Sequence, residues 1–127
     1  MIRGANAFSS FAVDNLEKAE GFYRDTLGLD VTRDEDMGVL TLDLTGDRNI
    51  MIYPKEDFEP ATYTILNFAV DDVDQMVIDL TDKGVSFERY EGFSQDEKGI
   101  ARDDRGPAIA WFKDPAGNIL SVLEGEM

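Results

Sequence analysis

The chain contains no cysteine and no histidine among its 127 residues. Without cysteine, disulfides, thiolate metal sites and a cysteine nucleophile are excluded. Histidine is the usual general base near neutral pH and the commonest metal ligand, so serine–histidine catalysis is excluded as well. Any metal would need an all-oxygen site, which suits Mg²⁺, Ca²⁺ or Mn²⁺ rather than Zn²⁺.

Basic residues are scarce too, since 12 Lys and Arg stand against 27 Asp and Glu, for a net charge of −15. Such a field repels phosphate backbones and anionic lipids, so we expect no nucleic-acid and no membrane partner. It would attract a cationic small molecule, although the same excess also suits a surface that is merely well solvated. The sequence starts without an apolar signal region and has no stretch of membrane-span length, which favours a cytoplasmic protein.

What the sequence does contain is an internal repeat. Residues 11–16 (Phe-Ala-Val-Asp-Asn-Leu) recur as residues 68–73 (Phe-Ala-Val-Asp-Asp-Val), 57 positions later. Each copy begins as an extended apolar run and then changes to helical spacing. Asp14 and Asp71 are the expected helix N-caps, and Gly28 and Gly84 stand where a glycine ends a helix.

Strands are expected after each helix, at the positions where apolar residues alternate or run together. The predicted order is strand, helix and three strands, twice over, with a turn at 114–117 that suits Pro at its second position and Gly at its fourth. The sequence thus predicts an α+β fold of two βαβββ modules in a single domain, with modules at 1–57 and 62–127, a linker at about 56–61, and a polar loop at 95–107 that is a candidate lid. The expected strands with ranges are 39–44, 49–53, 85–90, 108–113 and 119–123.

Two segments resemble the vicinal oxygen chelate superfamily, which includes glyoxalase I, extradiol dioxygenases, fosfomycin-resistance enzymes and bleomycin-resistance proteins. They are residues 13–28, with Phe-Tyr-Arg-Asp-Thr-Leu-Gly at 22–28, and residues 111–120, with Asp-Pro-Ala-Gly-Asn at 114–118. With the repeat between them, the resemblance spans essentially the whole chain. It implies the glyoxalase/bleomycin resistance fold, in which the two modules form a curved mixed sheet with a concave cup. It also implies a homodimer.

Alternation along the strands separates the residues under the helices from those that face the cup. The expected helix side holds Phe11, Val13, Ile50, Ile52, Leu66, Phe68, Val70, Leu120 and Val122. The expected cup side holds Phe8, Ser10, Met51, Tyr53, Ile65, Asn67, Ile119 and Ser121. Trp111 matches a cavity-facing position of the family and could stack on a flat or cationic ligand.

Metal-dependent members of the superfamily place one ligand on each of four strands, usually His or Glu. The matching positions here are Phe8, Met51, Ile65 and Ser121, with Asn49 or Tyr53 as alternatives to Met51. None of these side chains is a carboxylate or an imidazole, so no metal and no other cofactor is expected.

The favoured interpretation is therefore a metal-independent protein that binds, and could sequester, a small organic ligand, cationic or aromatic, in the cup. The expected ligand-binding residues are Phe8, Ser10, Met51, Tyr53, Ile65, Asn67, Trp111 and Ser121. A possible resistance protein of the bleomycin-resistance kind fits this description, and catalysis is not favoured.

Other interpretations stay open at this point. Phe8, Met51, Ile65 and Trp111 could fill the cup and leave no cavity. A glyoxalase-like lyase or isomerase could use carboxylate and tyrosine chemistry, with Tyr90, Lys98 and Arg102 closing over the ligand. A dioxygenase or glyoxalase could use displaced oxygen ligands such as Glu56, Asp57 or Glu59. A protein-interaction module without a small ligand is the fourth alternative.

Overall fold

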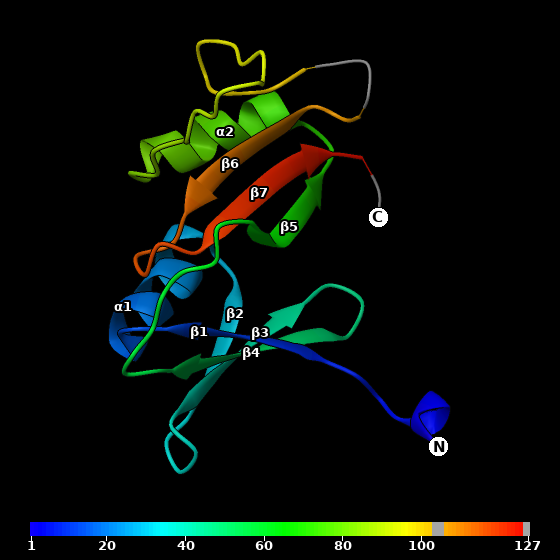
Figure 1. Ribbon diagram of the computed structural model, residues 1–127, viewed down its shortest axis with the longest axis vertical. Helices are drawn as coiled ribbons and strands as arrows, with labels where there is room; N and C mark the ends of the chain where they lie inside the picture. The colour runs from blue at the N-terminus through cyan, green and yellow to red at the C-terminus, as the bar shows by residue number, and fades with distance from the viewer. Residues whose placement is uncertain (103–105, 126–127) are drawn as a thin grey trace. The chain divides into compact units, whose positions relative to one another are not determined.

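The computed structural model describes residues 1–102 and 106–125 and divides into two compact units, Met1–Glu59 and Pro60–Met127. The division falls inside the segment 56–61. Each unit has a β-sheet and a helix of its own, and each is described below by itself (Figure 1).

The first unit contains a four-stranded mixed sheet with the strand order β1-β4-β3-β2. Strands β1 and β4 are parallel, and the β2–β3 and β3–β4 pairs are antiparallel. A short 3-10 helix, η1, precedes β1, and the helix α1 continues into a π-helical segment, η2, before β2. The bounds are η1 Ile2–Gly4, β1 Ser9–Val13, α1 Leu16–Gly21, η2 Phe22–Thr26, β2 Asp30–Asp34, β3 Val39–Leu44 and β4 Arg48–Pro54.

The core of the first unit lies between α1–η2 and one face of this sheet. Successive strand side chains point to opposite faces, so alternate residues face the helix and are fully buried. They are Val13, Leu40, Leu42 and Ile52, and Tyr23 of η2 is fully buried as well. The ring of Tyr23 contacts that of Phe11, with centroids 5.9 Å apart. Phe11, Val13 and Ile52 are thus on the helix side, as alternation predicted.

A charged cluster attaches α1 to β2. Glu20 accepts hydrogen bonds from Arg24 and, at 2.9 Å, from Arg33. These contacts hold the pKa of the Glu20 carboxyl below its usual range, with the Arg33 bond as the largest cause and the Arg24 bond next. Arg24 also donates to the Val31 carbonyl oxygen of β2 at 2.8 Å.

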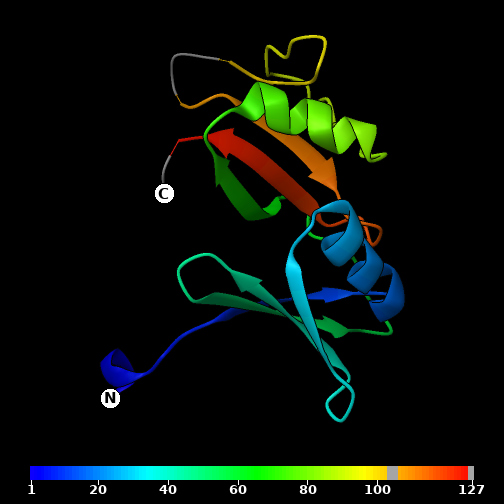
Figure 2. The same cartoon turned by 180° about the vertical axis from the view of Figure 1, so that it is seen from behind.

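The second unit contains a three-stranded sheet with the order β5-β7-β6 and one helix, α2 (Figures 1 and 2). Strands β5 and β7 are parallel, and β6 and β7 form an antiparallel hairpin. The helix α2 lies over one face of the sheet and buries Val73, Val77 and Leu80. The bounds are β5 Thr64–Val70, α2 Val73–Asp82, β6 Ile109–Lys113 and β7 Ile119–Glu124.

The β6–β7 turn forms around a buried aspartate. The amide of Gly117 donates to the Asp114 carbonyl oxygen at 3.0 Å, and the Asp114 carboxylate accepts from the amides of Ala116 and Asn118, both at 2.9 Å. Gly117 has φ +95°, a conformation that favours glycine. The aspartate-proline-glycine pattern predicted this turn, and the Asp114 side chain stabilises it through its hydrogen bonds to the turn amides.

Both predicted helix caps are wrong by one residue. The N-caps are Asn15, which accepts from the Lys18 amide at 3.0 Å, and Asp72, which accepts from the Gln75 amide at 3.1 Å. Asn15 and Asp72 are related by the same shift of 57 as the rest of the repeat. The competing Asp14 and Asp71 have the same capping chemistry, so residue type alone could not choose between neighbours.

The strand predicted at 85–90 does not form a ladder. Phe87 makes one isolated bridge to Phe112, and the Glu88 amide donates to the Trp111 carbonyl oxygen at 2.7 Å. Beyond that point the side chain of Gln95 hydrogen-bonds to the Glu88 carbonyl oxygen and the Tyr90 amide. These two backbone groups are therefore not available to pair with β6. Within the predicted loop 95–107, the structure describes residues 95–102 and 106–107, and residues 103–105 lie outside the described part of the chain.

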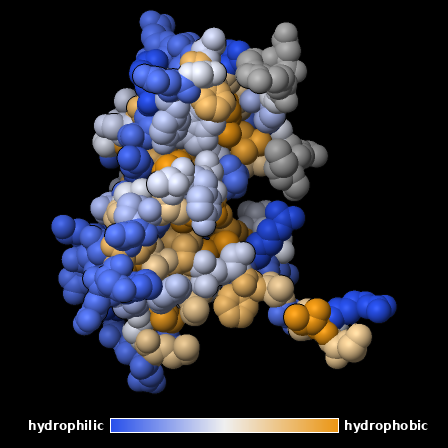
Figure 3. Space-filling model, viewed as in Figure 1, coloured by the Kyte–Doolittle hydropathy of each residue, from blue (hydrophilic) through white to orange (hydrophobic). Residues whose placement is uncertain are grey.

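Hydrophilic side chains cover much of the surface visible in Figure 3, in line with the net charge of −15. Apolar side chains are exposed at the N-terminal end, where Met1 and Ile2 lie. In the residues that the structure describes, there is no helix with the length and hydropathy that crossing a membrane would take.

Candidate functional site

Three predicted site residues lie side by side on the sheet of the second unit. Asn67 of β5 is paired with Ser121 of β7, and Ser121 is paired with Trp111 of β6. Paired residues on neighbouring strands point to the same face, so the three side chains form one row across the sheet. Leu120 and Val122 alternate with Ser121 and are buried on the opposite face, where α2 lies.

The polar end of this row is internally hydrogen-bonded. The hydroxyl of Ser121 is fully buried and donates to the side-chain oxygen of Asn67, which is itself exposed. Because the side-chain oxygen of Asn67 accepts from Ser121, its amide nitrogen is the group left to donate to a ligand. The row therefore offers a hydrogen-bond donor at one end and an indole ring at the other.

The indole of Trp111 is covered by two other rings. The ring of Phe93 lies with its centroid 4.9 Å from that of Trp111 at an interplanar angle of 58°, and the ring of Tyr90 lies 5.4 Å away at 76°. Trp111 is consequently only 8% exposed, whereas Phe93 is 46% exposed. Trp111, Tyr90 and Phe93 are called the ring cluster below.

The hydroxyl of Tyr90 is buried and has no hydrogen-bond partner within residues 1–102 and 106–125. Burial raises the pKa of Tyr90 above its ordinary value, and the nearby Glu88 carboxylate adds to the rise. The phenol is therefore protonated at neutral pH and can donate a hydrogen bond. A buried donor without a partner is costly in a folded protein, which makes it a functional candidate.

The segment that carries Tyr90 and Phe93 is held in place by Gln95. Its side-chain nitrogen donates to the carbonyl oxygens of Glu88, at 2.9 Å, and Gly99, at 2.8 Å. Its side-chain oxygen accepts from the Tyr90 amide at 2.8 Å. One side chain thus closes the loop at both ends. Gly99 has φ +90°, and a Cβ added there would lie 3.2 Å from the Phe87 side chain, so the position favours glycine.

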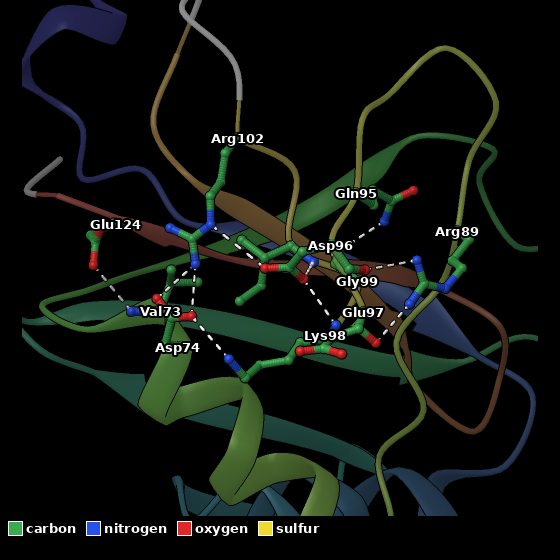
Figure 4. Close-up of polar contacts among 11 residues, drawn as sticks. Val73, Asp74, Arg89, Gln95, Asp96, Glu97, Lys98, Gly99, Arg102 and Glu124 are labelled. Carbon is green, nitrogen blue, oxygen red and sulfur yellow. Dashed lines mark hydrogen bonds and ion pairs between the residues drawn. The ribbon is translucent and has the colours of Figure 1, made fainter.

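Charged residues attach the same loop to the start of α2 (Figure 4). Arg102 donates to both carboxylate oxygens of Asp74 at 2.7 Å, and the Lys98 ammonium lies 3.3 Å from the same carboxylate. The Arg102 bond is the largest cause that lowers the pKa of Asp74. Arg89 donates to the carbonyl oxygens of Asp96 and Glu97. Lys98 and Arg102, which were candidates for closing over a ligand, are used here to tie the loop down.

The remaining predicted site residues belong mostly to the first unit. Ser10 of β1 is paired with Met51 of β4, so these two share a face, and Tyr53 lies two residues along the same strand. Met51 and Tyr53 are half-buried, and Ser10 is exposed. Phe8 precedes β1 and is 67% exposed. Ile65 belongs to the second unit, at an irregularity between Thr64 and Leu66 where β5 shifts register against β7.

The four positions expected to match metal ligands of the superfamily do not fit a metal. Phe8, Met51 and Ile65 have no oxygen or nitrogen in their side chains, and the Ser121 hydroxyl is already bonded to Asn67. The described residues contain no group of three or more Asp and Glu side chains placed to hold a metal ion. The donor chemistry of these four positions therefore does not support a metal-dependent reaction.

Tyr90, Phe93 and Gln95 belong to this candidate site. Sequence patterns indicate Tyr90 only as part of an alternative interpretation and do not single out Phe93 or Gln95. The available signal was a pair of aromatic residues within four positions, followed by an amide. It lay in a stretch expected to be strand and loop. It was weak because nothing in the sequence showed that the rings return to Trp111.

Comparison with known proteins places the chain among relatives of this architecture. The family model described as "Glyoxalase/Bleomycin resistance protein/Dioxygenase superfamily" matches residues 7–122. An uncharacterized protein of Bacillus subtilis (strain 168), YraH, is 27% identical over 125 residues, which cover 88% of this chain and 91% of that one.

Solved structures share the fold. A member of the same superfamily from Sphaerobacter thermophilus is 24% identical with a TM-score of 0.74, and 95% of this chain and 98% of that one are covered. TnmS3, an antibiotic binding protein from a Streptomyces species, is 22% identical with a TM-score of 0.71, and 97% and 98% are covered. The fold is thus α+β and of the glyoxalase/bleomycin resistance type, and the chain belongs to the Glyoxalase/Bleomycin resistance protein/Dioxygenase superfamily.

Proposed function

We propose that this protein binds a small organic molecule without a metal ion. The observation that carries the proposal is the chemistry of the four superfamily ligand positions, where Phe8, Met51 and Ile65 offer only apolar atoms and Ser121 a hydroxyl already engaged. Small-molecule sites are mostly apolar with a few placed polar groups, and that is the character of these side chains.

The row Asn67–Ser121–Trp111 supports the same proposal. It combines an amide donor, a fixed hydroxyl and an indole that the rings of Tyr90 and Phe93 cover, all on neighbouring strands, which is a rigid base for a ligand. The antibiotic-binding function in the name of TnmS3, a protein of the same fold, agrees with a binding role. The net charge of −15 disfavours anionic ligands and leaves aromatic and cationic ones.

Carboxylate catalysis finds no comparable support. A general acid needs a raised carboxyl pKa. In the described part of the chain, the carboxyl pKa values that depart clearly from normal, those of Glu20, Asp57 and Asp74, are lowered by Arg33, Lys55 and Arg102, respectively. These three groups are ionised partners of basic side chains. Binding is therefore proposed in preference to a glyoxalase-like lyase or isomerase.

A thermal-shift screen tests the proposal, with small aromatic and cationic compounds assayed in EDTA and, separately, in Mn²⁺ or Mg²⁺. Stabilisation by an organic compound in EDTA is the expected result, because a ligand that binds only the folded state raises the melting temperature. Stabilisation that needs Mn²⁺ or Mg²⁺ would contradict the proposal.

A matched pair of variants locates the binding. Asn67→Ala removes the amide donor of the row, and we expect about a fivefold to tenfold weaker binding of compounds that carry a hydrogen-bond acceptor. Gln75→Ala removes an amide from the exposed face of α2, where it bonds Asp79, and should leave binding unchanged. Equal behaviour of the two variants would remove the row from the site.

A further inference from the structure

The ring cluster differs from a packed hydrophobic core, because the outermost of its three aromatic rings is exposed to water. Two of its rings are held to Trp111 by a loop, and the outer one, Phe93, leaves nearly half of its surface in water. Phe93 follows Gly92, which has φ +89°, in a turn that has no regular secondary structure. A half-exposed ring on such a turn leaves its position at a lower cost than a fully buried ring would, because it loses less buried area.

The inner ring, Tyr90, brings the second observation. Its hydroxyl is buried without a described partner, although its amide is well satisfied by Gln95. A buried phenol without a hydrogen-bond partner lowers the stability of the folded protein. A ligand that accepts its hydrogen bond restores the lost free energy. Phe93 and Tyr90 thus point to the same site beside Trp111. Phe93 is a ring that a ligand can replace, and Tyr90 has a hydroxyl donor that a ligand can satisfy.

We propose that the ring cluster is the ligand site, and that its ligand is a neutral aromatic compound with a carbonyl or ether oxygen. The aromatic ring of the ligand replaces Phe93 on Trp111, and its oxygen accepts a hydrogen bond from the Tyr90 hydroxyl. Phe93 is then an internal stand-in that covers Trp111 while the site is empty. This inference rests on the proposed function and narrows its ligand from cationic or aromatic to neutral aromatic.

The choice of a neutral ligand follows from the charges around the cluster. An anion would meet the Glu88 carboxylate, which is close enough to raise the pKa of Tyr90. A cation would have to compete for Glu88 with the Lys113 ammonium, 3.6 Å away. A neutral acceptor meets neither obstacle and uses the proton that Tyr90 keeps.

Nuclear magnetic resonance can test this directly, because Trp111 is the single tryptophan and its indole N–H gives one resolvable signal. Three probes of similar size are titrated into the full chain: acetophenone, which has the ring and the acceptor, ethylbenzene, which lacks the acceptor, and phenyltrimethylammonium, which is a cation. We expect acetophenone to shift the indole signal and to bind more tightly than the other two.

Two conservative variants separate the roles of the rings. Tyr90→Phe keeps the ring and removes the donor, so acetophenone should bind about fivefold to tenfold more weakly while ethylbenzene is unaffected. Phe93→Ala removes the stand-in, so acetophenone should bind about threefold to tenfold more tightly. Acrylamide should also quench the Trp111 fluorescence of Phe93→Ala more strongly than that of the unaltered protein.

Several results would overturn the inference. Weaker acetophenone binding in Phe93→Ala would make Phe93 a wall of the site and not a stand-in. A preference for phenyltrimethylammonium would overturn the ligand class. Binding that stabilises the protein but leaves the indole signal and both variants unaffected would place the site elsewhere, and the proposed function would stand without this inference. Absence of binding by all three probes in all variants would also overturn it, while the thermal-shift screen judges the proposed function separately.

Discussion

Replacing Gln95 with alanine should destabilise the second unit more than any other change to an uncharged polar side chain outside its strands. The side chain makes three hydrogen bonds to backbone groups, at 2.8, 2.9 and 2.8 Å, and Gln95 is half-buried. Each such bond contributes about 1 kcal/mol net, and part-buried backbone groups left unpaired add to the loss. The expected decrease in the free energy of unfolding is therefore about 2–4 kcal/mol.

Urea unfolding at 25 °C, followed by both Trp111 fluorescence and far-UV circular dichroism, measures this loss. With an m-value of roughly 1.5 kcal/mol/M, a loss of about 3 kcal/mol lowers the transition midpoint by about 2 M. Because Gln95 also positions Tyr90 and Phe93 over Trp111, acrylamide should quench the variant more strongly in the folded state.

Gln75→Ala is the matched control, since Gln75 is an exposed amide with one side-chain hydrogen bond, to Asp79 at 2.8 Å. Its free energy of unfolding should change by no more than about 0.5 kcal/mol. If Gln95→Ala behaved like Gln75→Ala, the loop would not depend on this side chain. The explanation given for the missing strand at 85–90 would then be wrong as well.

Three further changes test other parts of the structure. Tyr90→Phe should raise the free energy of unfolding by about 1 kcal/mol, because it removes a buried donor that has no described partner; the exposed Tyr63→Phe should be neutral in the same urea assay, and a less stable Tyr90→Phe would show that the hydroxyl is satisfied. Glu20→Gln should cost about 1 kcal/mol at pH 7, since it weakens the contacts with Arg24 and Arg33. A lowered folded-state pKa stabilises the protein above the ordinary value of about 4.3 and ceases to do so as the pH falls through the folded value, so the difference should narrow as the pH is lowered below about 4 and persist at pH 9. Gly117→Ala should lower the free energy of unfolding by about 1–3 kcal/mol, because φ is +95° and the new Cβ would lie 3.3 Å from Pro60. Gly4→Ala, with open space around it, is the control and should leave the melting temperature unchanged.

Features that depend on short-range chemistry were predictable from the sequence. The Asp-Pro-Ala-Gly turn, the glycine ends of the helices and the strands predicted at 39–44 and 119–123 follow from local residue preferences and alternation, and the structure extends the second of these strands by one residue. The repeat then supplied the architecture, because two copies of one pattern imply two copies of one module. The family resemblance added the expectation of a mixed sheet. The parallel pairing of β1 with β4 and of β5 with β7 comes from the structure, because no local pattern contains it.

The ring cluster could not be predicted, because it depends on where a loop returns. Gln95 reaches back to Glu88 and Tyr90, and this contact converts an expected strand into a loop that covers Trp111. Likewise, the strand β2 at Asp30–Asp34 has three charged residues among its five, which is a weak strand signal, and it is a strand because β3 pairs with it. In both cases a tertiary contact overrides the local preference.

Isothermal titration of the protein with its strongest organic stabiliser from the thermal-shift screen, once in EDTA and once in Mn²⁺, shows whether ligand binding depends on a metal ion. Metal-independent binding predicts the same dissociation constant in both solutions, because no described group of side chains would hold the ion. Binding that disappears in EDTA and returns with Mn²⁺ would contradict the account and would place a metal in the site.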